Sequence, residues 1–213
     1  MALTLSTDTL AAARTVVDLA LSEPVRDRWT DESACAGMSV GGLAHHLTGQ
    51  VDSLARLLPT APADEAPIPV LEHYRRAAWV RSGLDDEPNV EIRTASDAKA
   101  GSGPAELAAN TVVQLTRLPA ALAAAEDADP VLIPWQGWAL TAHDFTVTRL
   151  MEMVVHADDL AASVGVDTPD FPADSVRRVL ALLTDVAVER HGQAALVRTL
   201  SRPQRAPSSV SAF

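Results

Sequence analysis

Apolar residues recur every three or four positions over most of the chain, which is the spacing of one face of an α-helix. The first such stretch covers residues 8–21, and Ser6 and Thr7 precede it. Serine and threonine hydroxyls accept hydrogen bonds from the free N–H groups of a first helical turn. We therefore predict a first helix over residues 8–21, with a cap at its N-terminal end.

A second apolar stripe lies between Ser39 and Pro59. Ser39 can cap a helix that begins at Val40, and Pro59 cannot continue it, so a helix is expected over residues 40–58. His46 falls within the apolar stripe of this helix. The neighbouring His45 points about 100° away around the helix axis, and we expect its side chain to be exposed.

Weaker patterns fill the middle of the chain. Between residues 59 and 100 they predict a Pro- and Ala-rich loop over 59–69, a short helix over 70–82 and a polar helix over 89–100. A longer Ala- and Leu-rich helix is expected from Pro104 to about residue 125, with a kink or break at Pro119. Residues 130–140 mix β-branched and aromatic side chains around a glycine, which favours an extended segment or a small hairpin.

The strongest helical pattern starts at either Thr141 or Asp144 and ends at Gly165, and we interpret Asp144 as its N-cap. Another helix is expected from residue 172 or 173 to about residue 190, and the tail from Ser201 is expected to be a loop. Four or five long helices with almost no strand predict an all-α, up-and-down bundle. The length of 213 residues suits one domain, over residues 1–200, followed by a tail of residues 201–213.

Composition and charge narrow the class of protein. The chain is 47% apolar and 21% charged, as a globular domain with a packed core is. Its net charge of −11 would repel nucleic acid and anionic membranes, so neither is an expected partner. The absence of a spanning apolar run and of a signal-peptide pattern predicts a cytoplasmic protein. Cys35 has no second cysteine to pair with, and we expect an inert, buried side chain.

Glu152 and His156 are the residues in the strongest helix that point to metal chemistry. They are four positions apart, so both side chains lie on the same side of the helix. The residues around them are apolar, and a buried carboxylate without a partner would be costly. A metal ion would remove that cost, and His46 from a facing helix would complete a three-ligand set of the kind found in catalytic sites.

Simpler interpretations of these residues stay open at this point. A histidine on an apolar face is often satisfied by a neighbouring polar group, and Glu–His pairs four residues apart are common on helix surfaces. The aromatic side chains Trp135, Trp138, Tyr74 and Trp79 either line a substrate pocket over the metal or pack within the core.

Two motifs resemble those of a known family. Residues 38–47, MSVGGLAHHL, are similar to the signature of the mycothiol-dependent maleylpyruvate isomerase family, which belongs to the DinB-like superfamily. In this alignment Met38 stands where the family has tryptophan, and His46 falls on the ligand position. Residues 149–160, RLMEMVVHADDL, resemble the helix of that family in which a glutamate, a histidine and an Asp-Leu pair follow one another at fixed spacing.

The resemblance implies a DinB-like four-helix bundle with additional short helices and a divalent ion held by His46, Glu152 and His156. It places Asp159 near the ion, where it helps to orient a ligand or substrate. The implied function is a metal-dependent enzyme in which a low-molecular-weight thiol, either mycothiol or another small thiol, is activated as a metal-bound thiolate and attacks an electrophilic small molecule in a transferase or isomerase reaction. Zn²⁺ suits the ligand set best, and Ni²⁺, Co²⁺, Fe²⁺ and Mn²⁺ are alternatives. The competing hypotheses are a non-catalytic bundle that binds a metal or small ligand and a metal-free scaffold, and a homodimer is one option for the assembly.

Overall fold

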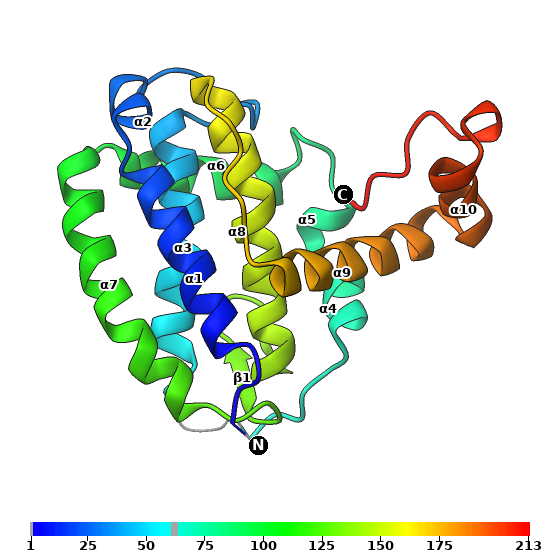
Figure 1. The fold of residues 1–213 in the computed structure, drawn as a ribbon, viewed down its shortest axis with the longest axis horizontal. Coiled ribbons are helices and arrows are strands. Elements are labelled where there is room, and N and C mark those ends of the chain that lie inside the picture. The colour runs from blue at the N-terminus through cyan, green and yellow to red at the C-terminus, as the bar shows by residue number, and fades with distance from the viewer. Residues whose placement is uncertain (1, 61–63) are drawn as a thin grey trace.

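A computed structural model describes residues 2–60 and 64–213 (Figure 1). Residues 61–63 of the loop expected over 59–69 lie outside the described part of the chain. Four long helices form the body of the molecule: α1 (Ser6–Ala20), α3 (Val40–Leu57), α7 (Pro104–Ala124) and α8 (Ala142–Val164). Helix α1 packs against α3, α7 and α8, and α3 also packs against α7 and α8. The predicted all-α four-helix bundle is therefore confirmed.

The two helices at the centre of this bundle begin at hydroxyl caps. The Ser39 hydroxyl accepts a hydrogen bond from the backbone N–H of Gly42 at 3.0 Å, as predicted. The Thr141 hydroxyl accepts one from the backbone N–H of Asp144 at 3.0 Å, so the prediction that Asp144 is the N-cap of α8 is wrong. Gly165 ends α8 with a φ of 72°, a left-handed conformation that glycine adopts without steric cost.

The apolar faces of α3 and α8 meet in the core. Leu43, Leu47 and Leu54 on α3 are completely buried, as are Phe145 and Leu150 on α8. Burying side chains of this size stabilises the fold by roughly 1.5–3 kcal/mol each. The same packing fixes the orientation of the two helices, and it therefore fixes the polar side chains that these helices carry.

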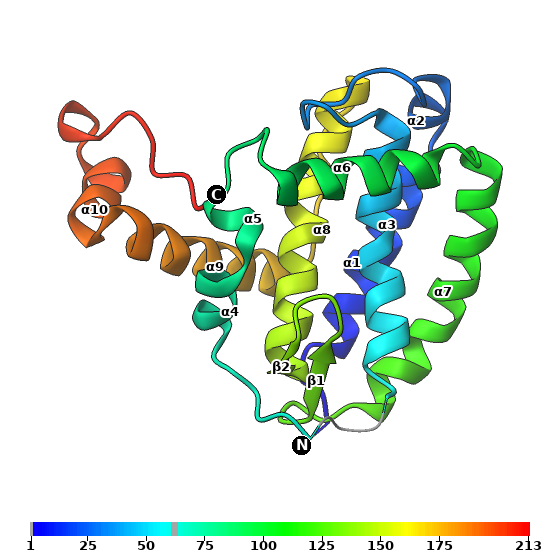
Figure 2. The same ribbon diagram turned by 180° about the vertical axis from the view of Figure 1, so that it is seen from behind.

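Shorter elements cover the bundle. Helix α2 (Glu23–Asp27) precedes α3, and α6 (Glu87–Ala100) crosses the face of α3 (Figure 2). The strands β1 (Pro130–Ile133) and β2 (Trp138–Thr141) form an antiparallel hairpin in which Ile133 pairs with Trp138. Of the two forms expected for residues 130–140, the structure has the hairpin, and it leads directly into α8.

Several details differ from the sequence predictions. Ser6 and Thr7 do not cap the first helix, because both lie within the first turn of α1, whose N-cap is Leu5 and makes no side-chain cap hydrogen bond. The helix expected over residues 70–82 is two helices, α4 (Val70–Arg76) and α5 (Ala78–Arg81), because Ala77 between them is extended, with a ψ of 115°. Pro119 lies within α7 without ending it. Residues beyond Gly192 form helix α10 (Gln193–Ser201) and the short 3₁₀ helix η1 (Pro203–Arg205), neither of which was predicted.

The C-terminal part of the chain extends from the bundle. Helix α9 (Ala173–His191) packs against α1, α4 and α8, and it continues into α10 away from the four-helix body (Figures 1 and 2). The last residues return towards α5, where the ring of Phe213 lies 4.9 Å from that of Trp79. Within the described residues, no helix combines the length and apolar character needed to cross a membrane.

Candidate metal centre

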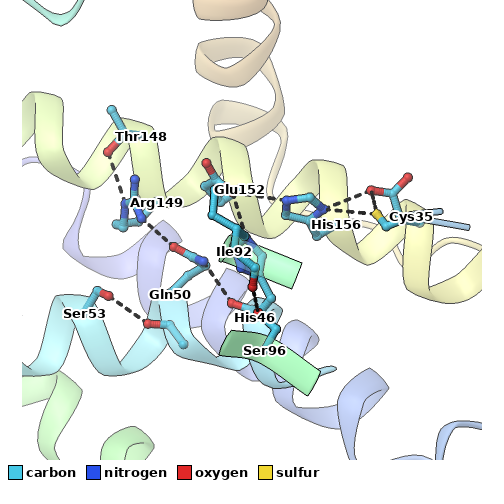
Figure 3. A network of polar contacts seen from close by, with 12 residues as sticks. Cys35, His46, Gln50, Ser53, Ile92, Ser96, Thr148, Arg149, Glu152 and His156 are labelled. Atoms are coloured by element: carbon cyan, nitrogen blue, oxygen red, sulfur yellow. Dashed lines mark hydrogen bonds and ion pairs between the residues drawn. The ribbon is translucent and has the colours of Figure 1, made fainter. Parts of the chain in front are cut away.

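His46, Glu152 and His156 meet where α3 and α8 pack against each other. His46 lies in the second turn of α3, on the side that faces α8, and Glu152 and His156 occupy successive turns of α8 (Figure 3). The four-residue spacing places the two α8 side chains on one face of that helix. The structure thus brings together three predicted site residues, one of which is more than 100 positions from the others.

The donor atoms of these three side chains point towards a common centre. Glu152 Oε2 lies 3.4 Å from His46 Nε2 and 3.2 Å from His156 Nε2. All three donor atoms lie within 4.8 Å of one another. The side chains are 13–22% exposed, so the centre is shielded but not sealed.

These distances fit the metal ion that the donor set suggests. With bonds of about 2.0–2.1 Å, two ligand atoms of a tetrahedral zinc ion lie roughly 3.3 Å apart. The two measured separations from Glu152 fall close to that value. Two imidazoles and one carboxylate are also the ligand set of known catalytic zinc sites, in which a fourth position is left for water or substrate.

Asp159 holds the imidazole of His156 from its other side. Asp159 Oδ2 lies 2.9 Å from His156 Nδ1, and Nδ1–H donates the hydrogen bond because an ionised carboxylate only accepts. With Nδ1 holding its proton in this hydrogen bond, Nε2 is the nitrogen that faces Glu152 and His46, and it becomes a ligand atom when it loses its own proton. This arrangement of carboxylate, histidine and metal position recurs in metal sites, where it fixes the tautomer and the orientation of the ring.

Cys35 extends this set of contacts on the side of Asp159. Its thiol donates to Asp159 Oδ2 at 3.3 Å, and Cys35 Sγ lies 3.9 Å from His156 Nδ1 (Figure 3). The side chain is half-buried, so the expectation of full burial is wrong. Cys35, His156 and Asp159 form a second group whose donor atoms approach one another closely, and it shares His156 with the first group.

A polar bridge from α8 to α3 supports His46. The guanidinium of Arg149 donates to Gln50 Oε1 at 2.6 Å, and Gln50 Nε2 donates to the backbone carbonyl of His46 at 2.9 Å (Figure 3). Arg149 precedes Glu152 by one turn of α8. The bridge therefore ties the backbone that carries His46 to the helix that carries the other two side chains.

The acidic and basic groups of the centre each stabilise the charged form of the other, and this shifts their pKa values. Burial alone would raise the pKa of Glu152, but its hydrogen bonds with His156 and His46 outweigh burial and hold this pKa well below its ordinary value. Burial alone would lower the pKa of His156, and the contacts with Asp159, Cys35 and Glu152 instead raise it well above its ordinary value. Burial also acts to raise the pKa of Asp159, and the hydrogen bond from His156 lowers it. Without an ion, the centre is thus a protonated imidazole between two carboxylates.

The remaining histidine and aromatic candidates lie in other surroundings. His45 is half-buried rather than exposed, because its ring packs 5.9 Å from that of Trp29, and its buried Nε2 has no hydrogen-bond partner among the described residues. Trp138 donates to His73 Nδ1 at 3.1 Å, and Trp135 is 54% exposed. In the part of the chain that the structure describes, neither tryptophan has a contact that places it at the His–Glu–His group.

A helical bundle with a His–Glu–His group between two of its long helices has the fold and ligand set of a DinB-like metal-binding protein. The family model described as the mycothiol maleylpyruvate isomerase N-terminal domain matches residues 10–161, and the chain belongs to this family. The matched region contains His46, Glu152, His156 and Asp159, whereas α9 and α10 lie beyond it. Comparison with curated proteins and with solved structures gives no match.

Proposed function

We propose that the protein is a metal-dependent enzyme that joins a low-molecular-weight thiol, mycothiol, to an electrophilic small molecule. The observation that carries the proposal is the convergence of three donor atoms, from His46, Glu152 and His156, within 4.8 Å of one another. Membership of a mycothiol-related, DinB-like metal-binding family supports the choice of thiol.

The three side chains would hold a divalent ion through two nitrogen atoms and one carboxylate oxygen, a set that suits Zn²⁺ and also accepts Ni²⁺, Co²⁺, Fe²⁺ or Mn²⁺. When bound, such an ion lowers the pKa of a thiol at its open position, so that the nucleophilic thiolate exists near neutral pH. Neutral imidazoles and a single carboxylate neutralise only part of the charge of the ion, which favours an anionic ligand there.

Asp159 and its surroundings contribute binding and orientation. The carboxylate keeps the proton of His156 on Nδ1, as described above, and leaves Nε2 free to act as a ligand. A cleft of about 430 Å³ lies beside Asp159, and Asp158, Asp170 and Phe171 also line it. Carboxylates accept hydrogen bonds from hydroxyl groups, so this cleft suits the sugar-like hydroxyls of mycothiol.

The proposed reaction forms one sulfur–carbon bond. The thiol gives up its proton, and the electrophile either gains that proton after addition across an activated double bond or releases a leaving group as an anion. The half-buried centre keeps bulk water from competing with the thiol for the electrophile.

The proposal is tested by mixing zinc-loaded protein with mycothiol and a panel of electrophiles, such as monochlorobimane and 1-chloro-2,4-dinitrobenzene, and measuring conjugate by mass spectrometry. We expect conjugate to form faster than without protein. Glu152→Gln should abolish the acceleration, and Glu23→Gln, the same change at an exposed position on α2, should leave it intact. A metal-loaded protein that accelerates none of these reactions would instead favour the non-catalytic binding module.

A further inference from the structure

Residues of α4, α5 and α9 line a second cleft, together with Ala212 near the C-terminal end. Figure 1 shows these three helices close together on the side to which the C-terminal residues return. The volume of the cleft is about 760 Å³. The residues that matter for its chemistry are Tyr74, Arg75, Arg81, Val186, Glu189 and Arg190. Helix α9 forms one wall of the cleft, and this helix lies outside the residues that match the family model.

The charge that lines this cleft is positive in a chain whose net charge is −11. Arg75 forms an ion pair with Glu189, and these two charges compensate each other. Arg190 makes a hydrogen bond to the backbone carbonyl of Ala212 at 3.4 Å, and no carboxylate of the described residues pairs with Arg190 or Arg81. Two cationic groups therefore remain available to a ligand.

Tyr74 supplies an unused hydrogen-bond donor in the same wall. The side chain is only 3% exposed, and its hydroxyl has no hydrogen-bond partner among the described residues. A buried polar group without a partner destabilises the fold by roughly 1–3 kcal/mol. Burial raises the pKa of Tyr74, and the charge of Glu152 raises it further, so the hydroxyl keeps its proton and stays a donor.

We propose that this cleft binds the anionic group, a carboxylate or a phosphate, of a small organic molecule. Arg81 and Arg190 supply the positive charge at the surface of the cleft. The Tyr74 hydroxyl is buried in the cleft wall, and a ligand oxygen becomes its acceptor once binding moves the wall enough to expose it. Val186 and the ring of Tyr74 form apolar surface for the organic part of the ligand. The inference requires neither a metal nor a thiol, so it stands independently of the proposed conjugation reaction.

The test measures binding of three probes of similar shape by isothermal titration calorimetry: benzoate, phenyl phosphate and the neutral benzamide. At least one of the two anions should bind, and benzamide should bind at least about tenfold more weakly, because a hydrogen bond to a charged group contributes roughly 1.5–3 kcal/mol. The anion that binds more tightly identifies the group that the cleft prefers. Equal binding of benzamide, or no binding of either anion, would overturn the proposal.

Variants locate the bound anion. Arg81→Gln and Tyr74→Phe should each weaken binding about tenfold, whereas Arg56→Gln, on the exposed face of α3, should leave it unchanged. Glu152→Gln removes a candidate metal ligand, and anion binding should survive in that variant. Loss of binding in Glu152→Gln alone would place the anion at the metal centre and contradict the proposal, as would wild-type binding in both Arg81→Gln and Tyr74→Phe.

Discussion

Asp159 contacts the metal centre only through His156, so its replacement by asparagine tests how the centre is organised. Asparagine keeps the size of the side chain but removes the charge that accepts the Nδ1–H of His156 at 2.9 Å. The side-chain amide can also turn its NH₂ group towards the ring, which would oppose the Nδ1–H tautomer. We therefore expect Asp159→Asn to weaken metal binding without removing a ligand.

The expected loss follows from the geometry of this contact. Replacing a residue that hydrogen-bonds a metal-bound histidine typically lowers metal affinity by about 10- to 100-fold, which corresponds to roughly 1.4–2.7 kcal/mol. Asp158 offers a matched control, because it is the adjacent residue, has the same charge, is exposed and bonds to Thr168 instead. Removing its charge changes the general electrostatic attraction for the ion but no contact with His156. We expect Asp158→Asn to change affinity by less than about threefold.

The measurement is competition for zinc between the protein and a chromophoric chelator, at fixed pH and ionic strength. Circular dichroism spectra of the two variants would show that both remain folded. If Asp158→Asn and Asp159→Asn lose the same affinity, the contact with His156 has no special role. The reasoning about the tautomer would then be refuted.

Two further predictions concern pH and packing. The pKa of metal-free His156 is raised above its ordinary 6.5, so an ion that binds must displace a proton. Zinc affinity should therefore rise from about pH 6 to pH 9, and calorimetry should detect the released proton. A zinc affinity that does not depend on pH would contradict this prediction. The unfolding free energy of the metal-free protein should fall as pH rises through that raised pKa. In α3, Gly41→Ala places a Cβ 2.5 Å from the ring of Trp29 and should destabilise the fold by about 1–3 kcal/mol in urea unfolding. Gly49→Ala meets no atom of the described residues within 4 Å and should be neutral or stabilising. Equal effects of the two substitutions would contradict this packing.

The helix ends could be predicted from the sequence where they depend on residues close by in the chain. Ser39 and Gly165 mark helix ends because their roles depend on neighbours within a few residues. Ala77 carries no such signal, yet it separates α4 from α5, and both Tyr74 and Trp79 contact Phe213 from distant sequence. The helix break there accompanies tertiary packing that a local pattern does not contain.

The same limit applies to the metal centre. The four-residue spacing of Glu152 and His156 predicts that their side chains lie on one side of a helix, and the place of His46 in the apolar stripe of a facing helix suggests the third donor. The position of Asp159 beside them comes from the family resemblance alone. Cys35 lies in a connection 121 positions before His156, and no period relates the two residues. The backbone N–H of Ala34 donates a hydrogen bond to Ser163 near the end of α8. This tertiary contact, which no sequence period encodes, brings the thiol of Cys35 to Asp159.

The central claim is that one ion is held jointly by α3 and α8, and the metal content of dialysed protein tests it most directly. After loading with zinc, wild-type protein and His45→Ala should each retain about one ion per chain, because His45 lies outside the His–Glu–His group. His46→Ala should retain little or none. A wild-type protein without stoichiometric zinc, or a His46→Ala variant that retains as much zinc as His45→Ala, would contradict the claim.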